Sequence, residues 1–192
     1  MSFSLVRADD LPPQPWRNGG GSTRELVAWP GSAAWQVRVS VAEIERDGPF
    51  SHFPGVQRWF TVLKGAGVTL DIAGTRHRLT RTDEPLCFDG SAVTACLLLD
   101  GPTRDLNLML RGASGAMVLV DDGLAWQPNA TLCGLFTAVA GRCIAGTQSV
   151  DVPAYALLWF DPAPVSLCFE AGARPAGATG WWLAATPEAR TT

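Results

Sequence analysis

The chain has 192 residues, of which 47% are hydrophobic and 17% are charged, and its formal net charge is −3 at pH 7. A chain of this length and composition can bury a core of its own, as one domain or as two small halves. The slightly negative charge offers no bulk attraction to nucleic acid or to an anionic membrane, so we expect neither as a partner.

The cysteines and the N-terminus indicate the cellular compartment. None of the five cysteines forms a Cys-x-x-Cys pair, and most lie in apolar runs. We therefore expect buried free thiols in a cytoplasmic protein. The opening MSFSLVRADDLPP lacks the long apolar core of a signal peptide, and every apolar run is too short to cross a bilayer.

Short β-branched and aromatic runs, separated by Gly, Pro and Asp, predict an all-β sandwich or barrel. In the clearest run, WQVRVSVAEI, apolar residues alternate with polar ones, so one face is apolar and the opposite face carries Arg38. In chain order the predicted strands are Glu25–Ala28, Trp35–Ile44, Trp59–Leu63, Val68–Ile72, Ala95–Leu99, Leu106–Leu110, Ala116–Val120, Leu135–Val139, Tyr155–Phe160, Val165–Phe169 and Trp181–Ala185.

Two short matches indicate an internal repeat. FTVLKG at residues 60–65 recurs as FTAVAG at 136–141, and LCFDG at 86–90 is echoed by LWFDP at 158–162. Their common order and similar spacing favour a duplicated β unit. The second copy is shorter and carries fewer charges, so we expect it to be the structural partner of the first.

The stretch PWRNGGGSTREL combines three consecutive glycines with an aromatic ring, two arginines and Glu25. It matches neither a Walker loop nor a dinucleotide fingerprint, and a strand pattern follows it. It is either a flexible turn or the rim of a pocket, where glycine lets the backbone approach a ligand. In the second case Trp16 is the stacking candidate and Asn18 supplies an amide.

The stretch DGPFSHFPGVQRWFTVLKGAG resembles the first motif of the cupin superfamily, which binds a metal through His-x-His and a glutamate. Here His52 takes the first histidine position, Pro54 the second, and Arg58 the glutamate position. Because the chain has only two histidines, a three-histidine site is excluded and a two-histidine, one-carboxylate site is the remaining alternative. A guanidinium at that position would repel a metal ion, so we expect no cofactor.

Arg58 is suited to bind an anion instead, because a guanidinium forms two parallel hydrogen bonds with a carboxylate. The alternative is a rim arginine paired with Asp47 or Asp89. In LDGPTRDLNLMLR, Asp105 and Asn107 share one strand face. Facing inward they would offer an acceptor and an amide beside Arg58, and facing outward they would be an ordinary solvated face.

Together these stretches resemble the HutD/Ves family of bacterial proteins. PWRNGGGSTRE, RVSVAEIERDGPFSHFPGVQRWFTVLKGAG, FDG and DLNLMLR occur in the family's order up to Arg111. The resemblance implies a metal-free bicupin, with two cupin-like jelly-roll barrels at residues 1–112 and 113–192 packed in one chain and strands exchanged between them. The family motif commonly has lysine where this chain has Arg17.

The family's HutD branch is associated with histidine-utilisation genes, and its Ves branch with stress response. The resemblance to the HutD branch implies a regulator that binds a pathway intermediate such as urocanate or N-formylglutamate. It also implies that the residues at the motif positions form the pocket: Asn18, Glu25, Arg38, Arg58, Asp105 and Asn107.

We therefore predict a small-carboxylate-binding protein in which Arg58 pairs with the carboxylate and both asparagines fix polar groups. Glu25 or Asp105 would accept a hydrogen bond from the ligand, and Trp16 would cover the entrance. One alternative is a metal-independent enzyme, an isomerase or hydrolase of a small organic acid, with Glu25 or Asp105 as base and His52 as acid. Further alternatives are an interaction module and a metal oxygenase. Paired sheet edges could also make a homodimer.

Overall fold

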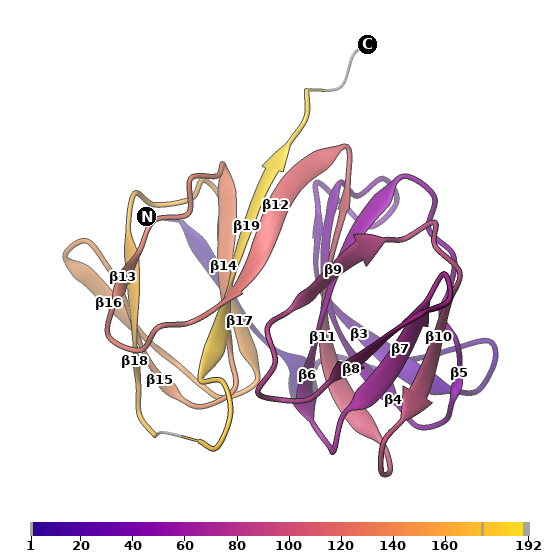
Figure 1. The fold of residues 1–192 in the computed structure, drawn as a ribbon. Coiled ribbons are helices and arrows are strands. Elements are labelled where there is room, and N and C mark those ends of the chain that lie inside the picture. The colour runs from indigo at the N-terminus through magenta and orange to yellow at the C-terminus, as the bar shows by residue number, and fades with distance from the viewer. Residues whose placement is uncertain (1, 174, 190–192) are drawn as a thin grey trace. The chain divides into compact units, whose positions relative to one another are not determined.

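The computed structural model of this protein describes residues 2–173 and 175–189 (Figure 1). Over this part of the chain the regular structure consists of strands and one short 3-10 helix, η1 (Ala8–Asp10). The prediction of an all-β fold is confirmed. Within the same residues, no helix has the length and apolar character needed to cross a membrane. The chain divides into a first unit, Leu11–Gly112, and a second unit, residues 1–10 together with 113–192.

The first unit contains two antiparallel sheets. The larger has the strand order β2-β3-β4-β11-β6-β9, and the smaller has the order β5-β10-β7-β8. Their strands are β2 (Gln14–Pro15), β3 (Gly21–Trp29), β4 (Val37–Ile44), β5 (Gly48–Pro49), β6 (Val56–Lys64), β7 (Val68–Ile72), β8 (Thr75–Leu79), β9 (Leu86–Asp89), β10 (Thr94–Leu98) and β11 (Thr103–Arg111).

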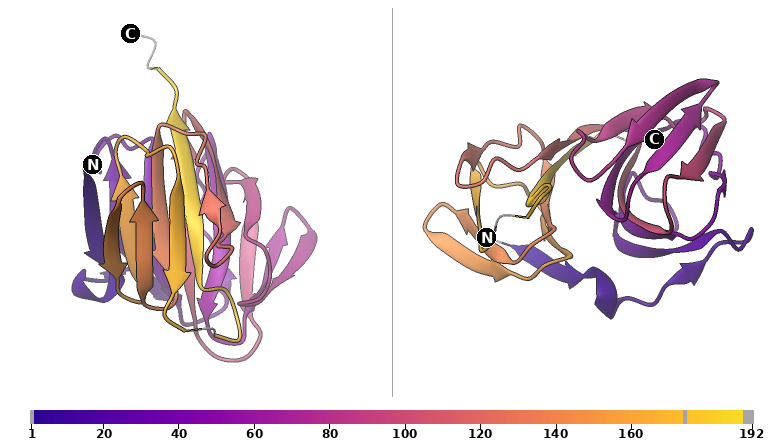
Figure 2. Two further views of the ribbon diagram at one scale, coloured as in Figure 1. Left: turned by 90° about the vertical axis from the view of Figure 1, so that its left-hand side faces the viewer. Right: turned by 60° about the horizontal axis from the view of Figure 1, so that its bottom comes forward.

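The second unit also contains two antiparallel sheets, of order β1-β17-β14-β19-β12 and β13-β18-β15-β16. Figure 2 shows the sheets of each unit from two further directions. The strands are β1 (Phe3–Arg7), β12 (Ala113–Leu119), β13 (Ala125–Trp126), β14 (Leu132–Thr137), β15 (Gly141–Ala145), β16 (Gln148–Val152), β17 (Ala156–Phe160), β18 (Leu167–Ala171) and β19 (Gly180–Pro187).

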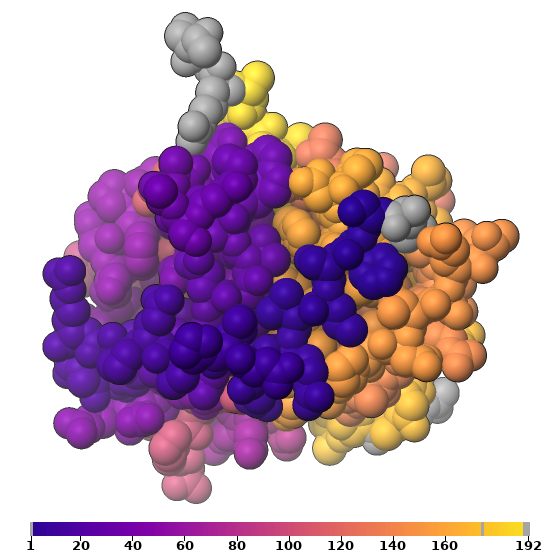
Figure 3. Space-filling model, turned by 180° about the vertical axis from the view of Figure 1, so that it is seen from behind, coloured from indigo at the N-terminus to yellow at the C-terminus, as the bar shows by residue number. Residues whose placement is uncertain are grey.

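Residues 2–10 belong to the second unit because β1 is hydrogen-bonded to β17. Phe3 lies opposite Phe160 and Arg7 lies opposite Ala156. In the space-filling view this indigo segment lies against orange residues of its own unit (Figure 3). Phe3 and Leu5 stay exposed on it, as expected for a strand at the edge of a sheet.

The two units repeat one topology. The order β4-β11-β6-β9 in the first corresponds to β12-β19-β14-β17 in the second, and β5-β10-β7-β8 corresponds to β13-β18-β15-β16. The numbers of these corresponding strands differ by eight, and β1, β2 and β3 lie outside the repeat. The repeated sequences fall on corresponding strands, since Phe60 and Phe136 lie in β6 and β14. The internal repeat predicted from sequence therefore has a structural counterpart.

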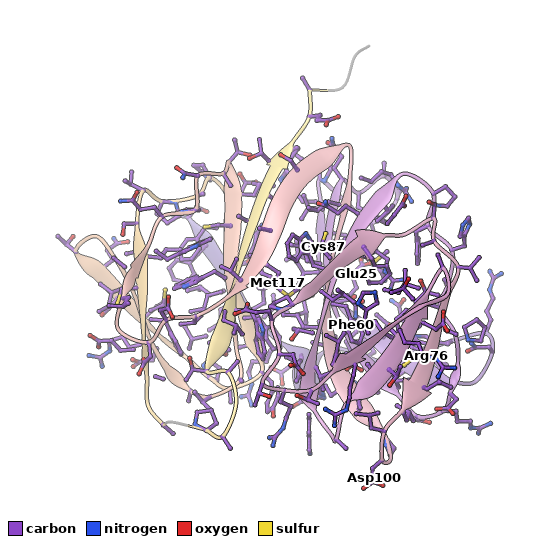
Figure 4. All side chains as sticks on the ribbon, viewed as in Figure 1. Glu25, Phe60, Arg76, Cys87, Asp100 and Met117 are labelled. Atoms are coloured by element: carbon purple, nitrogen blue, oxygen red, sulfur yellow. The ribbon has the colours of Figure 1, made fainter. Side chains whose placement is uncertain are left out.

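Each unit buries its own apolar core. In the first, Phe60 and Val62 of the larger sheet pack with Leu70 and Cys96 of the smaller, and Figure 4 shows Phe60 in the interior of that unit. In the second, the ring of Trp182 stacks on Trp126 with their centroids 4.8 Å apart. The alternation of apolar residues along the strands produces these cores, because successive side chains point to opposite sheet faces.

All five cysteines are free, and most are buried as expected, although Cys87 is exposed on β9. Burial raises the pKa of the Cys96, Cys133 and Cys143 thiols to about 12. These thiols are therefore protonated at neutral pH, and a protonated thiol is a poor nucleophile.

Candidate functional site

The first unit contains a cavity of about 470 Å³, a size typical of small-molecule sites. Three segments surround it: the glycine-rich loop between β2 and β3, the segment that follows β5, and one face of the larger sheet. The lining residues are Pro15, Trp16, Arg17, Asn18, Thr23, Arg38, Ser40, Ala42, Ile44, Pro49, Phe50, Ser51, Phe53, Arg58, Phe60, Asn107 and Met109.

The floor of the cavity is the face of the larger sheet that lines it. On this floor, residues directly opposite one another on neighbouring strands form rows, because they share a sheet face. On the central strand β11, Met109 lies opposite Arg38 of β4 and opposite Arg58 of β6. Two guanidinium side chains therefore flank one thioether in the same row.

The neighbouring row of the floor is less charged. Asn107 of β11 lies opposite Ser40 on one side and Phe60 on the other. Of the two side chains predicted to share a face of β11, Asn107 therefore lines the cavity.

Arg58 is a buried cation, only 7% exposed. Its Nη2 donates to Asn107 Oδ1 over 3.3 Å, while its Nε has no hydrogen-bond partner. The guanidinium carbon lies 5.0 Å from the ring centroids of Phe50 and Phe88 and 5.7 Å from that of Phe53. Burial, and to a smaller extent the charge of Arg38, lowers the pKa of Arg58 to about 10, so the side chain is still protonated at neutral pH.

No carboxylate of the described residues forms an ion pair with Arg58. Asp47 and Asp89 are the acidic neighbours expected for a rim arginine, but both accept backbone hydrogen bonds instead, from Leu98 and Ser91. The interpretation of Arg58 as an exposed, locally paired arginine is therefore wrong.

Arg38 is hydrogen-bonded to Glu25, which lies outside the cavity lining. Its Nε donates to Glu25 Oε2 over 2.7 Å, and Ser32 Oγ donates to Glu25 Oε1 over 2.8 Å. Burial alone would raise the pKa of Glu25, but the hydrogen bonds from Arg38 and Ser32 and the charge of Arg38 lower it overall. Nη1 of Arg38 lies 3.9 Å from Met109 Sδ, which places one end of this guanidinium beside the central strand of the floor.

The glycine-rich loop forms one wall of the cavity. Trp16 Nε1 donates to Thr23 Oγ1 over 2.8 Å, and its ring meets Phe50 edge-on with centroids 6.4 Å apart. Asn18 Oδ1 accepts a hydrogen bond from the backbone N–H of Gly20 over 3.0 Å. The loop thus shapes a cavity wall, as the rim interpretation of PWRNGGGSTREL predicted.

At two positions of this loop the backbone geometry favours glycine. Gly19 has a φ of +67°, and a Cβ on Gly21 would lie 2.1 Å from the carbonyl oxygen of Glu43. Because backbone cannot move aside as a flexible side chain can, Gly21→Ala should lower the free energy of unfolding by about 2 kcal/mol or more. Urea denaturation measures the loss. A Cβ on Gly31 would meet nothing within 4 Å, so Gly31→Ala is the control, and equal stability of the two variants would contradict the prediction.

The structure brings five of the eight predicted site residues into the lining: Trp16, Asn18, Arg38, Arg58 and Asn107. Glu25 lies outside it, engaged by Arg38. His52 is exposed and its ring Nε2 contacts the carbonyl oxygen of Ser91. Asp105 is fully buried and also outside the lining.

Several lining residues were not predicted from the sequence. Met109 is two residues from Asn107 in the alternating sequence DLNLMLR, so its position on the same strand face could have been predicted. Phe50 and Phe53 lie in a turn-rich segment, whose sequence gives no periodic signal.

The lining does not fit a metal. It offers no His, Cys, Asp or Glu side chain, which are the usual protein ligands of transition metals, and two guanidiniums flank its floor. Among the described residues of the whole chain, no three such side chains come together in a group that could hold an ion.

Comparison with known proteins identifies the family. The HutD family model matches residues 8–161. The chain belongs to the HutD family. Over 109 residues it is 41% identical to an uncharacterised 21.2 kDa protein in the hutC 3′ region of Pseudomonas putida, a match that covers 56% of this chain and 57% of the relative. It is also 33% identical over 153 residues to protein Ves of Citrobacter koseri, covering 69% and 78%. The resemblance to the HutD/Ves family is confirmed.

Solved structures agree with this assignment. HutD from Pseudomonas fluorescens SBW25, solved in a formate condition, superimposes with a TM-score of 0.82 at 27% identity, covering 98% of this chain and all (100%) of that one. Salicylate 1,2-dioxygenase from Pseudoaminobacter salicylatoxidans gives a TM-score of 0.63 at 9% identity, covering 95% and 80%. The latter likeness shows a cupin-like fold and nothing about chemistry.

Proposed function

We propose that this member of the HutD family binds a small carboxylate in the cavity of its first unit. One observation carries the proposal. Arg58 is buried and protonated, its Nε lacks a hydrogen-bond partner, and no acidic side chain lines the cavity around it. Burying an unpaired charge is costly, and a ligand carboxylate in the cavity would supply a charge partner for the guanidinium.

The energy available from this pairing is sufficient for binding. Hydrogen bonds to charged groups contribute about 1.5–3 kcal/mol each, and a guanidinium offers a carboxylate two in parallel. The rings of Phe50, Phe53 and Phe88 around Arg58 exclude water, which strengthens the electrostatic attraction. In this proposal Asn18 and Asn107 fix further polar atoms of the ligand, and Trp16 covers the entrance.

The comparisons support a place in histidine utilisation. One relative is a protein in the hutC 3′ region, and one structural neighbour is HutD itself, solved in a formate condition. We therefore propose that the ligand is an intermediate of that pathway, such as urocanate or N-formylglutamate. The protein would then act as a cytoplasmic regulator whose state reports the level of this intermediate.

We also propose that the chain is a bicupin in which each unit is one cupin-like barrel. The support is the shared topology, in which β4 to β11 of the first unit correspond to β12 to β19 of the second. The first unit would hold the ligand, whereas the second, filled by apolar residues around Trp182, would be structural.

The lining favours binding over catalysis. An isomerase or hydrolase would need an acid and a base in reach of the ligand. The groups considered for these roles, Glu25, Asp105 and His52, all lie outside the lining.

A thermal-shift screen tests the proposal. Metal-free protein is heated with urocanate, N-formylglutamate, formate, glutamate or histidine, alongside Arg58→Ala. At least one acid should raise the melting temperature of the natural chain, because a ligand that binds only the folded state stabilises it. The shift should vanish in Arg58→Ala. A shift that persists in the variant would remove Arg58 from the site, and no shift with any acid would contradict carboxylate binding.

A further inference from the structure

The amide oxygens of both cavity asparagines already accept one hydrogen bond each. Asn18 Oδ1 accepts from the backbone N–H of Gly20 over 3.0 Å, and Asn107 Oδ1 accepts from Arg58 Nη2 over 3.3 Å. Because both neighbours can only donate, the orientation of each amide is fixed by chemistry. The NH₂ group of each asparagine, a hydrogen-bond donor, is the part of the amide without a hydrogen-bond partner among the described residues, whereas the oxygen already has one.

Apart from the hydroxyls of Ser40 and Ser51, which can donate or accept, the other polar side chains of the lining have the same bias. Arg17, Arg38 and Arg58 offer only donors. Thr23 Oγ1 already accepts from Trp16 Nε1, which leaves its hydroxyl hydrogen for a ligand. Glu25, the carboxylate that binds Arg38, is outside the lining and has both oxygens engaged, by Arg38 and Ser32.

We infer that the cavity selects carboxylates without an ammonium group and rejects those that carry one, α-amino acids included. This inference rests on the proposed function, since it names the chemical class of ligand that the same site takes. The site would thereby distinguish an amino acid from the same acid after its amino group has been removed.

The physical reason is twofold. An ammonium group brings three N–H donors, and the lining offers it no carboxylate, while each asparagine oxygen already accepts one hydrogen bond. A site discriminates strongly when the wrong ligand would leave buried polar groups unpaired. In addition, the ammonium would lie near Arg58 and Arg38, and repulsion between like charges is weakly screened where water is excluded.

Matched pairs of acids test the inference. We would titrate the natural chain by calorimetry at pH 7.5 with glutarate and L-glutamate, succinate and L-aspartate, and urocanate and L-histidine. Wherever at least one acid of a pair binds, the amine-free acid should bind at least about tenfold more tightly than the amino acid. This corresponds to a difference in binding free energy of about 1.4 kcal/mol. Equal or reversed affinities would overturn the inference while leaving carboxylate binding intact. Binding of no acid at all would contradict the proposed function, and the inference would fall with it.

A variant then links the selectivity to the lining. Asn107→Asp places a carboxylate next to Arg58, so the amine-free acids should lose at least about tenfold in affinity while the amino acids lose less. The ratio of the two affinities should therefore shrink. Asn129→Asp makes the same chemical change at an exposed position of the second unit and should leave the ratio unchanged. An unchanged ratio in a folded Asn107→Asp protein, checked by its melting curve, would overturn the inference.

Discussion

Replacing Arg58 with methionine is expected to abolish carboxylate binding and at the same time to stabilise the protein. In the folded chain Arg58 is surrounded by three phenylalanine rings and has one hydrogen bond, to Asn107. A methionine of similar length would fill the same apolar space without a charge. Buried charges replaced by apolar residues of similar volume often leave a protein unchanged or more stable.

The pKa of Arg58 gives the sign of the stability effect. It falls from 12.5 to about 10 on folding, so the unfolded state binds this proton more tightly than the folded state does. Below about pH 10 the group therefore opposes folding, by about 3 kcal/mol for a drop of this size. The contacts of the guanidinium with the rings and Asn107 offset part of this cost. We expect Arg58→Met to raise the free energy of unfolding by about 1–2 kcal/mol at pH 7.

Urea denaturation and calorimetry measure the two effects on the same samples. Arg111 is a suitable control, because its guanidinium lies over the ring of Trp35, 4.4 Å from the centroid, but it is exposed. Arg111→Met should leave binding intact and not stabilise the fold. A protein with methionine at 58 that binds the acid normally, or that is less stable than the natural chain, would contradict the prediction. The expected pattern is that of a residue kept for function at the expense of stability.

Much of the fold could be predicted because the strands carry local patterns. The predicted strand Val68–Ile72 coincides with β7, and the alternation of WQVRVSVAEI places Val37, Val39 and Val41 in the core. Strand β8, with the sequence TRHRL, was missed because its polar residues are mostly exposed and resemble a loop. Strand β1 was missed because its partner is β17, more than a hundred residues away, and short-range patterns carry no information about such pairing.

The site could be predicted only in part, because local patterns carry no information about long-range contacts. Spacing placed Asp105 and Asn107 on one face of a strand but could not decide whether that face points inward, which depends on the sheet it joins. The register shift between Glu25 and Val27 in β3 likewise has no signature that we recognised in the sequence. Glu25 was expected to contact the ligand because it falls on a motif position of the family, whereas in the structure it binds Arg38. His52 matched a metal-binding motif, but its ring contacts the carbonyl oxygen of Ser91.

Replacing Asp105 with asparagine is expected to stabilise the protein at neutral pH. Asp105 is fully buried. Its Oδ2 accepts from Thr103 Oγ1 over 2.8 Å, whereas its Oδ1 has no hydrogen-bond partner. Burial raises the pKa of this carboxyl well above its usual range; the hydrogen bond from Thr103 opposes the shift, and the charge of Glu43 adds to it. An amide oxygen can keep the Thr103 contact without a charge to bury.

The raised pKa makes the effect depend on pH. Because the folded state holds the proton more tightly than the unfolded state, this group favours folding most below its ordinary pKa of 3.8. Its contribution is lost as the pH rises from there through the folded value. Asparagine does not titrate, so Asp105→Asn should gain about 1–2 kcal/mol relative to the natural chain at pH 7 and little or nothing near pH 4.

Urea denaturation of both proteins from pH 4 to pH 8 checks this difference, in which the titration of all other groups cancels. Asp151→Asn is the control, because Asp151 is exposed and its only hydrogen bond of the described set is with Arg142; it should change stability by less than about 0.5 kcal/mol. Ligand affinity should be unaffected by Asp105→Asn, since Asp105 does not line the cavity. A stable Asp105→Asn protein that no longer binds the acid would contradict this prediction. It would show that Asp105 is needed for ligand binding, as expected from the sequence, and does not merely lower the stability of the fold.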